Sequence, residues 1–351
     1  MRFSVHSLLS VALFCLLLVG CTDSIREEPW EKPVIITTSF ASNYLWHLLA
    51  TAEISYASDY SDRFRHTIDP ADLEFLRHNK QYLAFGSHGR TGPFTFLLAF
   101  LPSYLELETT KEFEEYFDLL NSGFKNFDFS AFFDHYSKAQ WDDPFIAMNS
   151  GIFDPPVEYR GKIKQQHPMF WRFRDVVINN LDAYRDGVWE EAKNGMQQRI
   201  NELSAKFIET DYIRMWEEQL NAEFDADRYK IILCYASKNG PDANSLSYDK
   251  NVFYCDSPLE RMVHFISHEI GTHILSRCFE LIDVEDYDQA EFYAAYEVLS
   301  MFYNKMVLRR DDLEYRLGQF HDEHYLAVFA KHYRKGISPA ELLTLSIRHK
   351  D

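Results

Sequence analysis

The spacing of apolar residues divides the chain into a mainly helical first part and a mixed second part. Apolar residues recur every three or four positions in residues 43–57, 111–120 and 170–183. The clearest such pattern covers residues 186–222. This spacing places apolar side chains on one face of a helix. We therefore predict a helical region over residues 38–225.

The pattern changes near residue 229. Residues 229–235 (YKIILCY) and 251–255 (NVFYC) are rich in β-branched and aromatic residues, which are typical of strands. A turn-rich segment lies between them, and helical spacing returns after Cys255 and continues to the end of the chain. This mixture predicts an α+β fold, predominantly helical, with a small sheet directly before a helix. We assign residues 226–351 to this second region.

The helix after the sheet has clear start signals and carries the most informative polar residues. We predict Ser257 as its N-cap and Pro258 as its first residue, with Glu260 completing a capping box. The helix then contains a cluster of potential ligands and bases, namely His264, His268, Glu269 and His273.

The spacing within this cluster decides how it could hold a metal ion. Helical zinc sites usually use two histidines four residues apart, but His268 and His273 are five apart. On a regular helix they would lie about 140° apart, too far to share one ion. A π-bulge near residues 270–272, around Gly271, would bring them together, and we predict one there. The rival pair, His264 with His268, has the usual spacing and needs no bulge.

A third ligand is expected from the next helix. Asp288 is its predicted N-cap, and Glu291 has the position of a capping-box partner. Glu297 has no such explanation, because its helical neighbours Tyr293, Ala294, Ser300 and Met301 are uncharged. A buried carboxylate on such a face needs a cation. We therefore prefer Glu297 as the third ligand and keep Glu291 as the alternative.

The segment His268-Glu269-Ile270-Gly271-Thr272-His273 resembles the motif of the microtubule-associated tyrosine carboxypeptidase family and its bacterial relatives. The resemblance covers roughly residues 260–300 and implies a zincin fold with bound Zn²⁺. It implies that His268 and His273 bind zinc, that Glu269 is the base and that a later glutamate completes the site. The family's later motif, Glu-Gly-Leu-Ala, is only partly matched by Glu297-Val298-Leu299-Ser300. The family's tubulin-tail substrate is not carried over to this chain.

These features predict a zinc hydrolase, specifically a peptidase in which Glu269 deprotonates a zinc-activated water. Asn244 and Ser245 precede the 251–255 strand and are candidates for an edge strand that pairs with a peptide substrate, or for a plain hairpin. The oxyanion could be stabilised by one of several side chains, namely Tyr293, Tyr296, His321, His324 or Tyr325. The alternative function is a non-catalytic zincin-fold lipoprotein that acts as a binding or assembly factor.

The N-terminus has the layout of an export signal. Arg2 precedes an apolar run over residues 8–18, which is too short to span a bilayer. The run ends Leu18-Val19-Gly20-Cys21, which resembles the lipobox of bacterial lipoproteins and implies lipid on Cys21. We predict a signal peptide over residues 1–20, a tether over residues 21–37 and a lipid-anchored protein of the bacterial cell envelope, at the outer membrane or periplasmic face. An ordinary signal peptide with a chance cysteine is the alternative.

The net charge of the chain limits its possible binding partners. A net charge of −18 argues against nucleic acid as a partner, since phosphate binding needs a basic patch.

The cysteines after Cys21 allow one disulfide. Cys234 and Cys255 lie in the two strand-like runs and could pair, which would leave Cys278 without a partner cysteine.

Overall fold

The structure is a computed structural model that describes residues 30–55, 59–84, 92–236, 243–279, 282, 287–310, 322–334 and 336–348. Residues 32–351 form one compact unit. Cys21, the predicted signal peptide and His321 lie outside the described residues. No helix within the described ranges combines the length and the apolar character needed to cross a bilayer.

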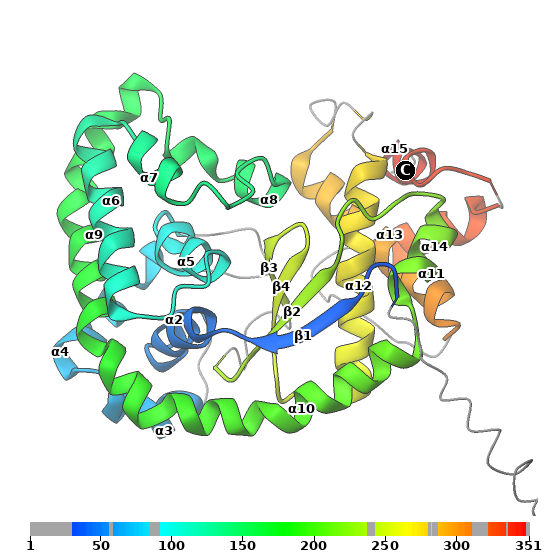
Figure 1. Ribbon diagram of the computed structural model, residues 1–351. Helices are drawn as coiled ribbons and strands as arrows, with labels where there is room; N and C mark the ends of the chain where they lie inside the picture. The colour runs from blue at the N-terminus through cyan, green and yellow to red at the C-terminus, as the bar shows by residue number, and fades with distance from the viewer. Residues whose placement is uncertain are drawn as a thin grey trace, which may run out of the picture. The chain divides into compact units, whose positions relative to one another are not determined.

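A four-stranded sheet forms the centre of the compact unit (Figure 1). Its strands are β1 (Val34–Thr38), β2 (Tyr229–Cys234), β3 (Ala243–Ser247) and β4 (Lys250–Tyr254), in the order β1-β2-β4-β3. β1, β2 and β4 are parallel, and β3 is an edge strand antiparallel to β4. Along β2, Ile231 and Leu233 belong to one hydrophobic core, whereas Ile232 and Cys234 belong to another. The sheet therefore separates two cores.

The first core is built from the helices between β1 and residue 184. They are α2 (Phe40–Thr51), α3 (Asp59–Phe64), α4 (Pro70–His78), α5 (Leu101–Tyr104), α6 (Thr110–Asn126), α7 (Ser130–His135), α8 (Pro144–Ala147) and α9 (Val157–Tyr184). Short turns add η1 (Arg65–Thr67), η2 (Lys80–Tyr82), η4 (Ser150–Ile152) and the π-helical η3 (Phe96–Phe100). The three predicted helical stretches correspond to α2, α6 and α9, although α2 ends at Thr51 and α9 begins earlier than predicted.

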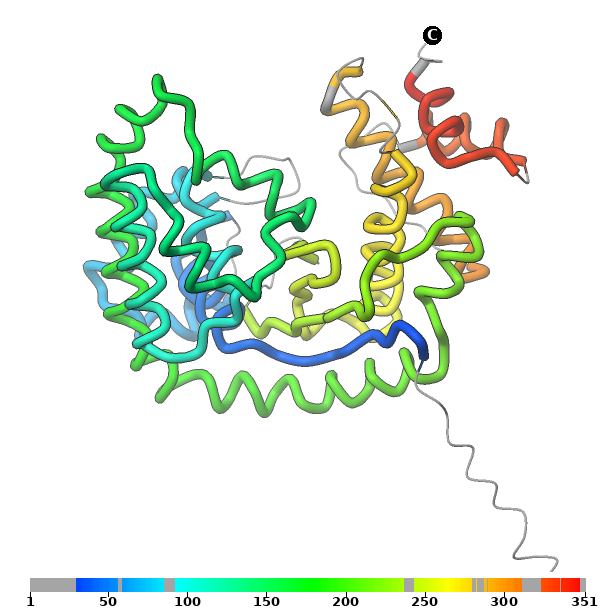
Figure 2. Tube along the Cα trace, turned by 45° about the horizontal axis from the view of Figure 1, so that its top comes forward, coloured from blue at the N-terminus to red at the C-terminus, as the bar shows by residue number. Residues whose placement is uncertain are grey.

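The second core lies on the other face of the sheet. Its helices are α10 (Glu190–Glu209), α11 (Tyr212–Leu220), α12 (Leu259–Cys278), α13 (Gln289–Leu308), α14 (Asp322–His332) and α15 (Pro339–Arg348), and the π-helical turn η5 (Arg185–Trp189) precedes α10. α10 runs beside β1, as Figure 2 shows, and α12 packs against α11 and α13. The architecture is mostly helical with a small mixed sheet, as an α+β fold requires.

The start of the compact unit differs from the sequence prediction. Residues 34–38 had been assigned to a tether and a helical region, but they form β1 and pair with β2 about 195 residues later in the chain. Just before β1, the Lys32 ammonium contacts Glu217 at 2.9 Å, Glu223 at 3.1 Å and the Phe224 carbonyl at 2.8 Å. The two predicted regions therefore share one sheet.

The two strand cysteines do not pair. Cys234 and Cys255 are both buried and free. In the parallel ladder Cys234 stands opposite Tyr254, so the next residue, Cys255, points to the other face of the sheet. Cys234 accordingly lies in the first core and Cys255 in the second. The disulfide that the strand positions had suggested is absent because the register separates the two thiols.

Candidate functional site

The start of α12 is one residue later than predicted. Pro258 is the N-cap residue, and no side chain caps the helix, so the prediction of Ser257 as the cap is wrong. The Pro258 carbonyl accepts the Met262 N–H at 2.9 Å and closes the first turn. Proline lacks an N–H but keeps its carbonyl, which is enough for this position.

The predicted π-bulge is also wrong. α12 is α-helical from Leu259 to Cys278, and Gly271 has a packing role instead. A Cβ atom at Gly271 would lie only 2.1 Å from Cζ2 of Trp216. The same indole donates its Nε1 hydrogen to Ser267 Oγ at 3.0 Å. Gly271 is therefore needed because α11 presses Trp216 against this turn of α12.

Because α12 is regular, the two histidines of the motif face different neighbours. His268 Nε2 lies 3.3 Å from Glu297 Oε2 on α13. His273 Nε2 lies 3.3 Å from Ser245 Oγ on β3. Both histidines are buried. The structure thus brings His268 and Glu297 together and turns His273 toward the edge strand.

Ser300 fixes the orientation of the His268 ring. Its hydroxyl donates to the His268 carbonyl at 3.3 Å, and its oxygen lies 3.1 Å from Nδ1, from which it can accept a hydrogen. Nε2 then faces the Glu297 carboxylate, so a proton or a cation is needed between them. Burial lowers the pKa of His268, but the hydrogen bond and charge of Glu297 raise it by more, and the net shift is upward.

Glu269 lies on the helix between these two histidines. Its Oε2 accepts a hydrogen from Asn251 Nδ2 at 3.2 Å, and the same amide contacts Ser245 Oγ at 3.2 Å. Burial raises the pKa of Glu269 to about 7, and the charge of Glu297 adds to this effect. A continuous polar network therefore joins His273, Ser245, Asn251 and Glu269.

Aromatic rings enclose His273. The Phe145, Tyr229 and Tyr248 rings lie 4.7, 5.6 and 5.7 Å from its ring, measured between centroids. Burial lowers the pKa of His273 to about 3. The imidazole is therefore neutral, which is the form that binds a metal.

Two buried polar atoms near Glu269 have no hydrogen-bond partner among the described residues. They are Asn251 Oδ1 and Tyr229 Oη, and both residues are fully buried. The pKa of Tyr229 is raised by burial and by the charge of Glu269, which places the phenol near that carboxylate. An unsatisfied buried polar group costs about 1–3 kcal/mol, so both atoms are open to a ligand or a water.

The fit of this site to zinc is partial. Within the described residues, no three His, Cys, Asp or Glu side chains are placed to share one ion. Two ligands of a tetrahedral zinc, each about 2.0–2.1 Å from the metal, are about 3.3 Å apart. The Nε2–Oε2 distance between His268 and Glu297 is 3.3 Å. This pair has the spacing of two zinc ligands, whereas His273 is directed away from it.

The alternative ligands make other contacts. Asp288 caps α13, as predicted, and accepts the Glu291 N–H at 3.0 Å, so Glu291 belongs to the first turn of α13. His264 lies one turn before His268, and its carbonyl accepts from Asn304 Nδ2 at 3.1 Å. Burial lowers the pKa of His264 to about 4. Glu297 is thus the predicted acid that contacts His268.

The oxyanion candidates separate by position. Tyr293 has a pKa raised by burial and by the charges of Glu297 and Glu269, and its side chain is 47% exposed. The Tyr296 hydroxyl instead donates to the Thr272 carbonyl. Tyr325 is buried with its ring 5.3 Å from that of His324. The charges of the same two carboxylates also raise the pKa of Tyr296, but its hydroxyl bonds Thr272, so Tyr293 is the better placed candidate.

The two edge-strand candidates, Asn244 and Ser245, lie on opposite faces of the sheet. Ser245 stands opposite Asn251 and contacts His273, so it faces α12. Asn244 stands opposite Val252, whose side chain belongs to the first core, so Asn244 shares that other face. Only Ser245 of the two contributes a side chain to the candidate site.

Comparison with known proteins adds no relative to this picture. No family model matches the chain, and neither a curated protein nor a solved structure is similar to it. The assignment of function therefore depends on the geometry. Sequence reasoning missed Asn251 and the role of Ser300, since only the folded chain brings them to Glu269 and His268.

Proposed function

We propose that this protein is a zinc-dependent peptide hydrolase with a zincin-like centre on α12 and α13. The observation that carries the proposal is the 3.3 Å contact between His268 Nε2 and Glu297 Oε2, beside the buried carboxyl group of Glu269. Imidazole and carboxylate groups are ligands in catalytic zinc sites, and a glutamate beside the first histidine serves there as the general base.

The residues that would hold zinc are His268 and Glu297, with His273 as third ligand only once its ring turns from Ser245 toward this pair. Zinc, when bound, supplies a Lewis acid that makes water acidic enough to lose a proton near neutral pH. Glu269 would take that proton and deliver it to the leaving amine. Asn251 holds Oε2 of Glu269, and Ser300 holds the ring of His268, so both groups are oriented before a substrate arrives.

A peptide is the substrate class that suits the surroundings of the centre. β3 is the edge of the sheet, and an extended peptide can add to such an edge through its main chain. Ser245 on β3 contacts His273, so a peptide on this edge would pass the centre. α8 packs against β3, and its Phe145 lies beside His273, so the N-terminal helices would form the opposite wall.

Two measurements test this proposal. The first is the metal content of the purified protein after stoichiometric loading with zinc. The second is cleavage of a peptide library by the zinc-loaded protein and by Glu269→Gln. The variant keeps the shape of the side chain but cannot accept a proton, so it should retain zinc while turnover falls roughly 100-fold or more. Full activity of Glu269→Gln would exclude the general-base role.

The third ligand is tested by comparing two histidine variants. His273→Ala should weaken zinc binding, whereas His264→Ala should leave it nearly unchanged. The opposite result would assign the site to the His264/His268 pair, which shares one helix face without a bulge.

A non-catalytic binding or assembly factor is the second candidate. Its supporting observation is that α12 is regular and holds His273 against Ser245 rather than against Glu297. In a protein without zinc, a protonated His268 would form an ion pair with the Glu297 carboxylate. A wild-type protein that binds no zinc under stoichiometric loading would favour this candidate over the hydrolase.

We also propose lipid attachment at Cys21 and a location in the bacterial cell envelope. The support is the lipobox-like sequence before Cys21 and the polar residues 22–33 that follow. Cys21→Ser should release the protein from the membrane fraction. Partition of the mature wild-type protein into the aqueous phase of a detergent separation would exclude the lipid.

A further inference from the structure

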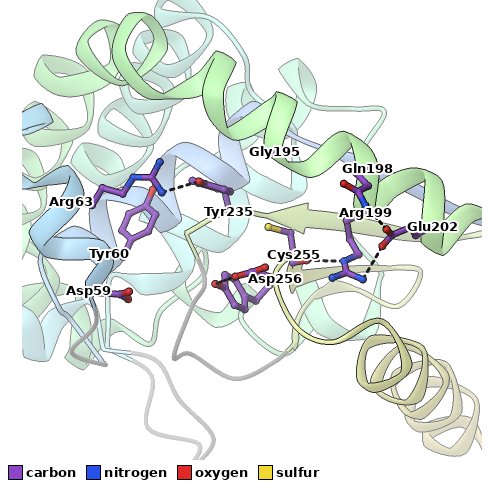
Figure 3. Close-up of a pocket in the computed structure, with 11 residues that line it drawn as sticks. Asp59, Tyr60, Arg63, Gly195, Gln198, Arg199, Glu202, Tyr235, Cys255 and Asp256 are labelled. Carbon is purple, nitrogen blue, oxygen red and sulfur yellow. Dashed lines mark hydrogen bonds and ion pairs between the residues drawn. The ribbon is translucent and has the colours of Figure 1, made fainter.

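A separate cavity opens at the carboxyl ends of β2 and β4, between α3 and α10 (Figure 3). Its volume is about 410 Å³. This lies within the range of small-molecule sites, which is roughly 300–1,000 Å³. Asn251 and Glu269 lie toward the opposite end of β4, and none of the proposed zinc-site residues lines the cavity. The cavity is therefore distinct from the proposed hydrolase centre.

Two guanidinium groups on opposite walls supply positive charge. Arg63 of α3 donates to the Tyr235 hydroxyl at 3.1 Å and pairs with Glu191. Arg199 of α10 donates through Nε to the Cys255 carbonyl at 3.2 Å and through Nη1 to Glu202 at 3.0 Å. A guanidinium has five N–H donors, so Arg199 keeps donors beyond these two bonds. Both groups are fixed in position before a ligand arrives.

Carboxylates line the same cavity. Asp59 comes from α3, Glu202 from α10 and Asp256 from the turn after β4. The Tyr254 hydroxyl lies 3.5 Å from Asp256 Oδ2. Burial raises the pKa of Tyr254, and the charges of Asp256 and Asp59 contribute to the shift. The part of the cavity around the Tyr254 hydroxyl is therefore negative.

Aromatic surface completes the lining. Tyr60, Tyr235 and Tyr254 all border the cavity, and the rings of Tyr60 and Tyr235 are 6.4 Å apart between centroids. Such rings bind apolar groups and also attract ammonium groups through their faces. The cavity thus offers positive, negative and apolar surface within one small volume.

We propose that this cavity binds a small zwitterion, a free amino acid or a dipeptide, with its carboxylate at Arg199 and its ammonium toward Asp256 and Asp59. A simple anion would meet Asp59, Asp256 and the Arg199 partner Glu202. A simple cation would meet Arg63 and Arg199, each of which also pairs with a glutamate. A ligand that carries both charges can satisfy both sets at once, and its side chain would contact the tyrosine rings.

The proposal is tested by calorimetric titration of the full chain with alanyl-leucine. Two blocked forms of the same dipeptide separate its charges: N-acetyl-alanyl-leucine lacks the ammonium, and alanyl-leucine amide lacks the carboxylate. Each should bind about tenfold more weakly or worse, because its blocked end then makes no ion pair with the cavity. Equal binding of either blocked form, or no binding of the dipeptide at tens of millimolar, would overturn the zwitterion assignment.

Variants place the ligand in this cavity. Asp256→Asn should weaken dipeptide binding and reduce the difference between the free and the N-acetylated dipeptide. Asp134→Asn is its control, since Asp134 is also exposed but lies on α7 outside the cavity. If Asp256→Asn binds the dipeptide like wild type, the ligand does not occupy this site.

Arg199→Gln addresses the carboxylate end. It should weaken binding of the free dipeptide more than binding of the dipeptide amide. Arg214 is an exposed arginine of α11, and Arg214→Gln should leave the binding of both forms unchanged. Because Arg199 also ties α10 to the end of β4, the folding of the variant is checked by circular dichroism. If Arg199→Gln does not fold, the Asp256→Asn result decides the proposal.

Discussion

Two buried histidines in this molecule have opposite electrostatic surroundings. His47, in the first core, has neutral partners on both ring nitrogens: the Tyr60 hydroxyl at 2.9 Å and the Thr67 hydroxyl at 3.0 Å. Burial lowers its pKa to about 3. His268, in the second core, is equally buried, but it faces the Glu297 carboxylate, and its pKa is raised.

The difference shows how a structural histidine can be told from a candidate ligand. Both ring nitrogens of His47 are hydrogen-bonded to neutral hydroxyl groups, so no charge near this ring attracts a cation. Around His268, two carboxylates, Glu297 and Glu269, are held in a largely uncharged interior, which is costly without a compensating positive charge. A proton on His268 supplies one such charge, and zinc would supply more. The following experiments test this contrast.

The largest effect is expected from Glu297→Ala. Glu297 is proposed as a direct zinc ligand, and losing a ligand should cost more zinc affinity than losing a residue that only orients one. Zinc affinity should therefore fall by at least about 100-fold. Glu291→Ala, at the start of the same helix, should leave zinc affinity unchanged and only weaken the helix start. Zinc titration monitored by a chromophoric chelator measures both. If the two variants behave alike, Glu297 is not a ligand.

Ser300→Ala should have a smaller effect on the same site. The hydroxyl orients the His268 ring through Nδ1, and loss of such a support typically costs about 10–100-fold in metal affinity or activity. Ser346 is an equally buried serine whose hydroxyl bonds only within its own helix. Ser346→Ala is therefore the control, and a zinc affinity in Ser300→Ala equal to that of the control would argue against the orienting role.

The His47 side of the comparison predicts a dependence of stability on pH. The folded-state pKa of about 3 lies below the ordinary value of 6.5, so between these pH values the unfolded chain binds a proton that the folded chain does not. Stability is therefore full above pH 6.5 and falls as the pH decreases, by about 2 kcal/mol at pH 5. Urea unfolding at pH 7.5 and pH 5 should show this loss reduced in His47→Gln.

The matched control for that experiment is His78→Gln, because His78 is exposed. It should retain the pH dependence of the wild type. A His47→Gln variant with an unchanged pH dependence would mean that other groups dominate acid unfolding.

The last effect concerns the packing that keeps α12 in place. Gly271→Ala places a methyl group against Trp216, and overpacking of this kind costs about 1–3 kcal/mol. Gly161→Ala, on the exposed start of α9 with open space around it, should instead stabilise slightly, by roughly 0.5–1 kcal/mol. Equal changes in the free energy of unfolding would contradict the close packing of Trp216.

Local patterns predicted much of this fold. The helical spacing of residues 186–222, the apolar run of β2 and the Asp288 cap each depend on neighbours in sequence, and the structure contains all three. β1 was missed because its five residues follow prolines and gain their meaning only from pairing with β2. A strand whose partner lies in a distant segment leaves little local signal.

The site was predictable in residue type but not in arrangement. The motif singled out His268, Glu269 and His273, and the uncharged neighbours of Glu297 marked it as unusual. The bulge prediction assumed that Gly271 marks a distorted backbone, whereas the glycine accommodates Trp216 from another helix. Likewise, nothing in the sequence around Asn251 indicates that its amide reaches Glu269. Contacts between distant elements were beyond the sequence, as was β1, which depends on such a contact.

The attachment of β1 has a mechanical consequence. Lys32 is clamped by two carboxylates and a carbonyl immediately before a strand that pairs with β2 through five residues. A pull on the N-terminus along this strand would load the whole ladder in shear, so its hydrogen bonds would share the force instead of opening one after another. The sheet would therefore resist mechanical unfolding by a force applied through the proposed lipid anchor.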